Sequence, residues 1–130
     1  MILSIIIPAK DEEGDIKNTV YEIHNHLLKN NIEHEIIVIN DHSKDSTLQI
    51  LNSLKNIIEE LKIINNTSEP GFGLTIRLGL ESYIGDIVAI VMADGSDSPE
   101  DLVKFYYKSL EDKTCVFGSR FSGGGTTQDY

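Results

Sequence analysis

The feature of this sequence that most constrains its fold is the alternation of short apolar runs with longer stretches of helical spacing. Apolar runs fall at residues 2–7, 35–39, 61–64, 86–92 and 114–117. Runs of this kind, the first of them stopped by Pro8, are typical of strands covered on both faces. Strands that alternate with helices imply right-handed crossovers and a mostly parallel sheet with helices on both faces. The sequence therefore predicts an α/β fold.

Helices are predicted between these strands and after the fourth. Apolar side chains recur every three or four positions at Ile16, Val20, Ile23 and Leu27, and again at Leu48, Leu51, Leu54 and Ile58. A third helix is expected to start near Gly73 and to run through Leu80. The fourth follows Ser98 and Pro99, because a serine can cap a helix and a proline suits its first turn.

Charge and cysteine content exclude several classes of function. The chain has 130 residues, which suits one domain, and a net charge of −10 with no stripe of Lys or Arg. Nucleic-acid binding is therefore disfavoured, because phosphate backbones need clustered cations. The single cysteine, Cys115, excludes an internal disulfide and fits a reducing compartment and a place in the core. No apolar run approaches the roughly 20 residues of a membrane span, so we expect a soluble, cytoplasmic segment.

The polar clusters of the sequence all follow predicted strands. In chain order they are "PAKDE", "NDHSKDST", "NNTSEPGFG", "ADGSD" and "GSRFSGGG". In open parallel sheets, ligands bind outside the carboxyl ends of the strands. These clusters are therefore the candidates for a binding site.

The acidic residues after the fourth strand have two competing explanations. Glu100 and Asp101 follow the Ser98 cap, and carboxylates there stabilise the positive end of a helix. Asp94 and Asp97 precede the cap, so capping does not explain them.

Metal binding is the other explanation. Asp94, Ser96 and Asp97 offer hard oxygen atoms of the kind that Mg²⁺ or Mn²⁺ takes, together with water and substrate phosphates. Arg120, after the fifth predicted strand, could bind the same phosphates through two parallel hydrogen bonds.

The cluster after the second strand has a similar ambiguity. Asn40 and Asp41 could bond a nucleobase or a ribose, and two polar residues at the end of a core strand are costly unless paired. Ser43 and Asp45 are better explained as turn and capping residues of the next helix.

Neither the glycines nor the histidines define a second kind of site. Gly71 and Gly73 lack the third glycine of a dinucleotide fingerprint, so they serve either turn geometry or the close approach of a ligand. The histidines show no metal spacing and are expected at the surface or in packing; they are His24, His26, His34 and His42.

The order of the motifs resembles that of the inverting family 2 glycosyltransferases, most closely the dolichyl-phosphate mannosyltransferase-like branch that glycosylates polyprenyl phosphates. "SIIIPAKDE", "IIVINDHSKDST", "GFGLTIRLGL", "GDIVAIVMADGSDSPEDL" and "VFGSRF" carry this resemblance. It implies a Rossmann-like GT-A fold that binds a nucleotide-diphosphate sugar. It also implies Mg²⁺ or Mn²⁺ as cofactor and, as acceptor, a lipid phosphate.

The resemblance assigns roles by position in the motifs. The residues implied to bind the nucleotide sugar are Pro8, Lys10, Glu12, Val38, Asn40, Asp41, Ala93, Asp94 and Arg120. Asp94 and Arg120 are implied to be catalytic at the diphosphate, and Asp94, Ser96 and Asp97 to hold the metal.

Several positions depart from the family pattern. Met92 stands where the first metal aspartate is expected, Asp11 replaces an asparagine, Asn40 an aspartate and His42 a glycine. The length departs as well. Residues 1–121 resemble the donor-binding part of a domain that is incomplete at its carboxyl end, and 122–130 read as a flexible glycine-rich tail or the start of an acceptor loop.

The expected function is transfer of a sugar from a nucleotide-diphosphate sugar to an acceptor, implied to be a polyprenyl phosphate, with inversion. The first alternative is a nucleotide-binding module without turnover. A nucleotidyltransferase is disfavoured, because the loop after the first strand is acidic apart from Lys10. A homo-oligomer is compatible with this reading, and membrane contact is expected only through sequence beyond residue 130.

Overall fold

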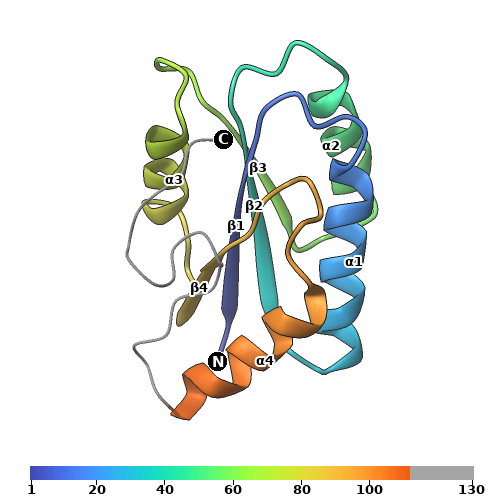
Figure 1. Ribbon diagram of the computed structural model, residues 1–130, viewed down its shortest axis with the longest axis vertical. Coiled ribbons are helices and arrows are strands. Elements are labelled where there is room, and N and C mark those ends of the chain that lie inside the picture. The colour runs from blue at the N-terminus through green and yellow to red at the C-terminus, as the bar shows by residue number, and fades with distance from the viewer. Residues whose placement is uncertain (112–130) are drawn as a thin grey trace.

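The structure is a computed structural model and describes residues 1–111. In chain order its elements are β1 (Leu3–Ala9), α1 (Ile16–Lys29), β2 (His34–Asn40), α2 (Thr47–Lys55), β3 (Leu61–Asn65), α3 (Phe72–Leu80), β4 (Ile87–Ile90) and α4 (Pro99–Glu111) (Figure 1). The predicted alternation of strands and helices is confirmed over this range. The fifth predicted strand, with Cys115, as well as Arg120 and the 122–130 segment, lie outside the described residues.

The strands form one parallel sheet in the order β3-β2-β1-β4. Ile6 of β1 lies level with Ile37 of β2 on one side and with Ile90 of β4 on the other. All four strands therefore end at the same edge, where the polar clusters of the sequence begin.

Helices cover both faces of the sheet, as predicted (Figure 1). Alternate side chains of β1, such as Ile5 and Ile7, pack with α1, α2 and α4 in the larger core cluster. Ile6 points to the opposite face and packs in a smaller cluster with Ile76 of α3. This alternation follows from the two-residue repeat of a strand.

Helix α3 lies unusually close to the sheet at Gly79. A Cβ atom on Gly79 would sit 2.5 Å from Cγ2 of Ile6. Only glycine permits this approach, which lets α3 reach β1.

The structure corrects the prediction that Pro8 stops the first strand. β1 continues to Ala9, and the amide of Asp41 donates to the Ala9 carbonyl over 2.8 Å. On the other side of β1, the amide of Val91 donates to the Ile6 carbonyl, and the next donor in that ladder would be residue 8. Pro8 has no amide hydrogen, so it ends the β1–β4 ladder and not the strand.

Two other elements end earlier than predicted. β4 was expected to reach Met92 but ends at Ile90, because the Asp97 carboxylate takes the amide hydrogen of Met92 over 2.9 Å. α2 ends at Lys55, and Ile58 is buried in the core just beyond the helix.

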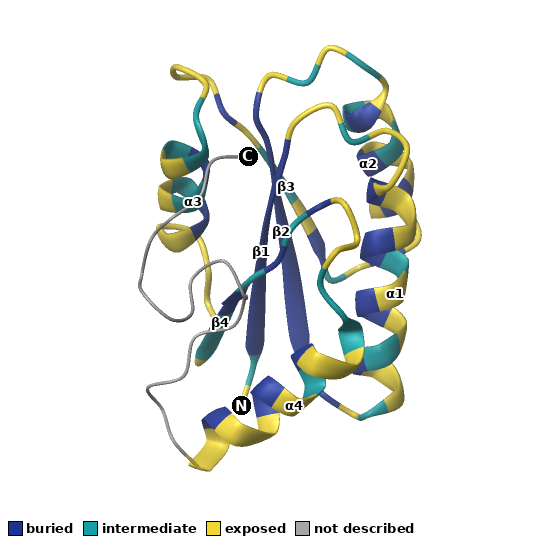
Figure 2. Cartoon of the chain, viewed as in Figure 1, coloured by how far each residue is buried: buried dark blue, intermediate teal, exposed yellow. Residues whose placement is uncertain are grey.

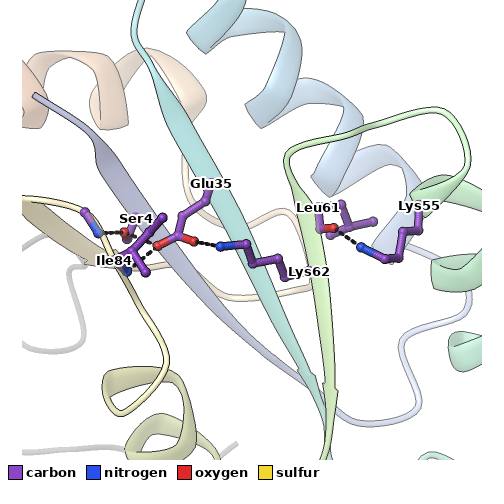
Figure 3. Close-up of polar contacts among 7 residues, drawn as sticks. Ser4, Glu35, Lys55, Leu61, Lys62 and Ile84 are labelled. Atoms are coloured by element: carbon purple, nitrogen blue, oxygen red, sulfur yellow. Dashed lines mark hydrogen bonds and ion pairs between the residues drawn. The ribbon is translucent and has the colours of Figure 1, made fainter.

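A buried carboxylate ties the amino ends of the strands together (Figure 3). Glu35 of β2, 4% exposed, accepts hydrogen bonds from Ser4 Oγ at 2.5 Å, from the Ile84 amide at 2.7 Å and from Lys62 Nζ at 2.5 Å. Ser4 Oγ in turn accepts from the Gly85 amide. Burial alone would raise the pKa of Glu35, but the bonds from Ile84, Lys62 and Ser4 outweigh it and hold that pKa below its usual value.

The histidines serve packing or lie near the surface, as predicted. His24 and His34 are buried, with His24 Nδ1 3.0 Å from His34 Nε2. Since His34 Nδ1 faces the Ile32 carbonyl at 2.9 Å, it donates there, and His34 Nε2 accepts from His24. Burial, and then His34, lower the pKa of His24. His26 is half-buried and His42 is exposed.

No helix within residues 1–111 has the length and apolar character needed to cross a membrane.

Candidate functional site

The carboxyl edge of the sheet carries the exposed polar residues that the sequence singled out. Figure 2 shows the buried central strands β1 and β2 leading into loops of mostly exposed or half-buried residues. The loops after β1, β2 and β3 meet at this edge, and the loop after β4 turns back across α1 (Figure 1). The expected position of the site at the strand ends is compatible with this arrangement.

The loop after β1 brings Glu12 close to Asp94. Pro8 is buried in the strand, Lys10 is exposed, and Glu12 is half-buried. Partial burial raises the pKa of Glu12, and the negative charge of Asp94 raises it further, followed by those of Asp15, Asp45 and Asp11. Two predicted site residues from distant parts of the sequence thus share one electrostatic environment.

At the end of β2, Asn40 leaves a polar atom without a partner. Its side chain is 6% exposed, and Nδ2 donates to Asn65 Oδ1 over 3.0 Å. Its Oδ1 is buried and has no hydrogen-bond partner within the part of the chain that the structure describes. A buried acceptor of this kind calls for an explanation, such as a bound group that donates to it.

Asp41 instead holds the loop after β3. It is fully buried; its Oδ1 accepts from Asn66 Nδ2 and its Oδ2 from the Gly71 amide, both over 3.0 Å. Asn66 also donates to the Glu69 carbonyl and accepts from the Ser68 amide. Asn66 was not singled out from the sequence as a site residue, although it directly follows β3.

The side chain of Val38 lies in the core and does not line the carboxyl edge of the sheet. It is completely buried in the larger core cluster, between the sheet and its helices. A ligand at the carboxyl edge could therefore meet only the backbone of Val38.

The loop after β4 is anchored from α1. Thr19 Oγ1 donates to the carbonyl of the buried Ala93 over 2.9 Å, which fixes the backbone directly before Asp94. Asp94 is exposed, and its Oδ1 accepts from the Ser96 amide over 3.0 Å. Thr19 carries no signal in the sequence, where it reads as one more position on an amphipathic helix.

The capping explanation for the later acids is confirmed. Ser98 Oγ accepts from the Asp101 amide over 3.3 Å, and α4 begins at Pro99 with Glu100 and Asp101 in its first turn. Ser98 Oγ also donates to Glu100 Oε1.

The residues present fit a metal ion shared with a ligand, and not one enclosed by protein. Within residues 1–111, no three His, Cys, Asp or Glu side chains form a group that could hold a metal ion. The Asp97 carboxylate bonds the Met92 amide, and Asp94 presents an exposed carboxylate. Mg²⁺ and Mn²⁺ are commonly held by one or two carboxylates plus phosphates and water, so Asp94 is the principal candidate ligand.

Known proteins are similar to this chain over almost its whole length. The family described as Glycosyl transferase family 2 matches residues 4–130. The chain belongs to this family.

Two relatives show how much of a longer glycosyltransferase this family 2 chain matches. An uncharacterised glycosyltransferase of Synechocystis is 31% identical over 96% of this chain and 39% of its own length. The UDP-N-acetylglucosamine–dolichyl-phosphate N-acetylglucosaminyltransferase of Methanococcus voltae is 30% identical over 92% of this chain and 52% of its own length. The family 2 chain thus spans about two fifths to one half of these relatives.

The fold of the family 2 chain is also found in a solved structure. Residues 1–349 of S. aureus TarS are 26% identical, with a TM-score of 0.67, over 95% of this chain and 40% of that one. The same TarS segment in complex with UDP-GlcNAc gives a TM-score of 0.65 at 25% identity. The expected GT-A fold is therefore confirmed.

Proposed function

We propose that this family 2 domain binds a nucleotide-diphosphate sugar at the carboxyl edge of its sheet and forms the donor-binding part of a glycosyltransferase. The observation that carries the proposal is that the neighbouring strands β2, β1 and β4 bring the unsatisfied Asn40 Oδ1, half-buried Glu12 and exposed Asp94 to one edge of the sheet. Two carboxylates that repel each other gain from a cation, and a cation held by exposed Asp94 would accept a diphosphate. The UDP-GlcNAc complex of the TarS segment supports a nucleotide sugar as ligand.

In this proposal the nucleoside lies against the loops after β1 and β2. Glu12 and Lys10 border it from the first loop. The unpartnered Asn40 Oδ1 accepts a hydrogen bond from it, and Pro8, Val38 and Asp41 shape the site from behind.

The diphosphate lies at the loop after β4. Ala93 supplies backbone there, and Asp94, with help from Ser96 or Asp97, holds Mg²⁺ or Mn²⁺. When bound, the ion stabilises the charge that develops on the departing diphosphate. Arg120 is proposed to bind the same phosphates.

The acceptor is proposed to be a polyprenyl phosphate. The Methanococcus voltae relative, whose name includes dolichyl phosphate, supports this choice. A phosphate oxygen is already anionic at neutral pH, so it can attack without a general base. Attack from the face opposite to the diphosphate inverts the anomeric carbon.

Calorimetric titration of the 130-residue chain with UDP and GDP, with and without Mn²⁺, tests the donor site. We expect Mn²⁺ to strengthen nucleotide binding in the wild type and to have little effect in Asp94→Asn. Asp86→Asn is the matched control, because it removes the same charge from a residue that bonds the Ile2 amide at the opposite end of the sheet. Nucleotide affinity that is the same with and without Mn²⁺ in the wild type and in both variants would overturn the metal role.

Sugar transfer to a polyprenyl phosphate, measured with labelled UDP-GlcNAc and GDP-mannose, tests the reaction. Formation of product by the protein supports the proposal. Tight nucleotide binding without any transfer by that protein would identify the domain as a nucleotide-binding module.

A further inference from the structure

The loops after β1 and β2 are joined by side chains that accept hydrogen bonds from the backbone of the opposite loop. Successive amides of the first loop donate to the second: Asp11 N to Ser43 Oγ at 3.0 Å, Glu12 N to Thr47 Oγ1 at 2.8 Å and Glu13 N to Asp45 Oδ2 at 3.1 Å. We call the residues that make these bonds the loop clamp.

The exchange also runs in the other direction. The Lys44 amide donates to Asp11 Oδ1 over 2.6 Å, and the Ser46 amide donates to Glu13 Oε1 over 3.0 Å. Backbone groups in loops are usually satisfied by water or within their own turn. Here each loop satisfies the other, so neither can shift without breaking several bonds.

Thr47 and Asp45 form the centre of the loop clamp. Thr47 is fully buried; its Oγ1 accepts from the Glu12 amide and donates to Asp45 Oδ1 over 2.5 Å. Asp45 Oδ1 also accepts from the Thr47 amide over 2.9 Å, so it bonds the first amide of α2 as a capping side chain would, although Ser46 occupies the N-cap position. Ser43, expected in the same role, bonds the Asp11 amide in the other loop.

Both loops contain a residue in a costly conformation. Asp11 has a φ of 52° and His42 a φ of 58°, in the left-handed region that favours glycine. Non-glycine residues remain there only when their surroundings enforce it, and such strain is often found at ligand sites. Asp11 belongs to the loop clamp, and His42 Nε2 lies 2.6 Å from the Ser68 carbonyl.

We propose that Thr47 and Asp45 are positioning residues for the nucleoside part of the donor. The inference rests on the proposed function, in which Glu12 and Asn40 contact the nucleoside from the two clamped loops. Thr47 holds the backbone of Glu12 directly. By fixing both loops before the ligand arrives, the loop clamp lowers the ordering cost of binding.

None of the hydrogen bonds that define the loop clamp reaches the loop after β4, where the diphosphate is proposed to bind. Asp94 is positioned separately, through the bond from Thr19 to the Ala93 carbonyl. Loss of the loop clamp should therefore weaken binding of the nucleoside much more than binding of the diphosphate, which Glu12 influences only through its charge. Loss of overall stability would instead affect both ligands.

The test compares Thr47→Val with Thr47→Ser in the 130-residue chain. Valine has the shape of threonine but leaves the Glu12 amide without its acceptor, whereas serine retains the hydroxyl. Because the Glu12 loop is no longer held before the ligand arrives, we expect Thr47→Val to raise the Kd for UDP or GDP roughly tenfold. The Kd for Mn²⁺-pyrophosphate should rise much less, and Thr47→Ser should restore nucleotide binding. Ser53→Ala, which removes an exposed hydroxyl from the same helix, is the control.

Hydrogen exchange provides a readout that does not depend on nucleotide. Thr47→Val should accelerate exchange at the amides of residues 11–13, 44 and 46 together, with no change in α4. Ser43→Ala, which removes one bond of the loop clamp, should have the same effect in smaller measure and serves if Thr47→Val does not fold.

Two results would overturn the positioning role: unchanged UDP and GDP affinity in Thr47→Val with faster loop exchange, or equal weakening of UDP and pyrophosphate. A wild-type chain that binds neither UDP nor GDP would overturn the proposed function, and with it the role of the loop clamp. The first two results leave donor binding by the wild type intact, so the failures are distinguishable.

Discussion

The two ends of the sheet differ in whether certain buried or half-buried polar groups find partners within the chain. At the amino end, Glu35 accepts bonds from Ser4, Lys62 and Ile84, and its pKa is lowered. At the carboxyl end, the pKa of Glu12 is raised by partial burial and by Asp94, and Asn40 Oδ1 lacks a partner among the described residues. Glu35 at the amino end finds its partners within the folded chain, whereas the carboxyl end holds groups that a ligand and a cation would satisfy.

The largest expected effect comes from Glu35→Ala. It leaves Ser4 Oγ and the Ile84 amide without their acceptor, and Lys62, which is 45% exposed, without its partner. Breaking a buried, bonded charge typically costs 3–5 kcal/mol, and partial exposure of the lysine reduces this to about 3 kcal/mol. Urea denaturation measures the loss. Glu33→Ala, which truncates an exposed neighbour, should change stability by less than about 0.5 kcal/mol; equal losses in the two variants would contradict the structural role of Glu35.

The next effect is the dependence of stability on pH. Since the folded-state pKa of Glu35 lies below its usual 4.5, its contribution to stability is present above that value and is lost as the pH falls through the folded-state pKa. Glu12 has the opposite sign: because its pKa is raised, its contribution to stability is fully present below the usual value and is lost as the pH rises through the folded-state pKa. Urea midpoints between pH 3 and pH 6 should therefore fall toward acid, and Glu35→Gln should flatten this slope more than Glu33→Gln.

Thr19→Val separates anchoring of the Asp94 loop from folding of the sheet. The change removes the donor to the Ala93 carbonyl, so we expect a loss of about 1–2 kcal/mol in unfolding free energy. Mn²⁺-pyrophosphate binding should weaken severalfold, because the backbone before Asp94 is released. Thr19→Ser retains the donor and should bind as the wild type does. Weakening in Thr19→Ser equal to that in Thr19→Val would rule out the hydroxyl as the cause.

The smallest expected effect is a gain in stability from a change at the carboxyl end of the sheet. Glu12→Gln removes the repulsion with Asp94, and we expect a gain of less than about 1 kcal/mol at neutral pH, as for other partly exposed charges. Nucleotide binding in the presence of Mn²⁺ should weaken in the same variant. Glu13→Gln is a matched neighbour whose Oε1 accepts from the Ser46 amide in the loop clamp; it should not show the gain. A loss of stability in Glu12→Gln would mean that repulsion between Glu12 and Asp94 does not destabilise the folded chain.

The alternation of apolar runs and helical spacing was sufficient to predict the parallel sheet and its helices. It was not sufficient for the strand ends, because Pro8 and Asp97 act through partners in other segments. The motifs also placed Glu12, Asn40 and Asp94 at one edge of the sheet, but not the contacts that fix them. Thr19 bonds a carbonyl 74 positions along the chain, a relation that no local pattern shows.

The carboxylate of Glu35 was missed for the same reason. It lies in a largely apolar strand, where a single acidic residue gives no sign of the Lys62 ammonium that pairs with it or of the Ile84 amide that donates to it. Whether Arg120 meets Asp94 at one diphosphate stays a prediction, since Arg120 lies outside the described residues.

Pro8 has a consequence for how this scaffold tolerates change. Because the imino acid terminates pairing between the central strand and β4, the segment from Met92 to Ser98 is not held in register with the strand beside it. Insertions or exchanges there should alter ligand preference while the four-stranded framework keeps its alignment. The proline ring thus separates a segment whose sequence can change from the strands whose pairing must be kept.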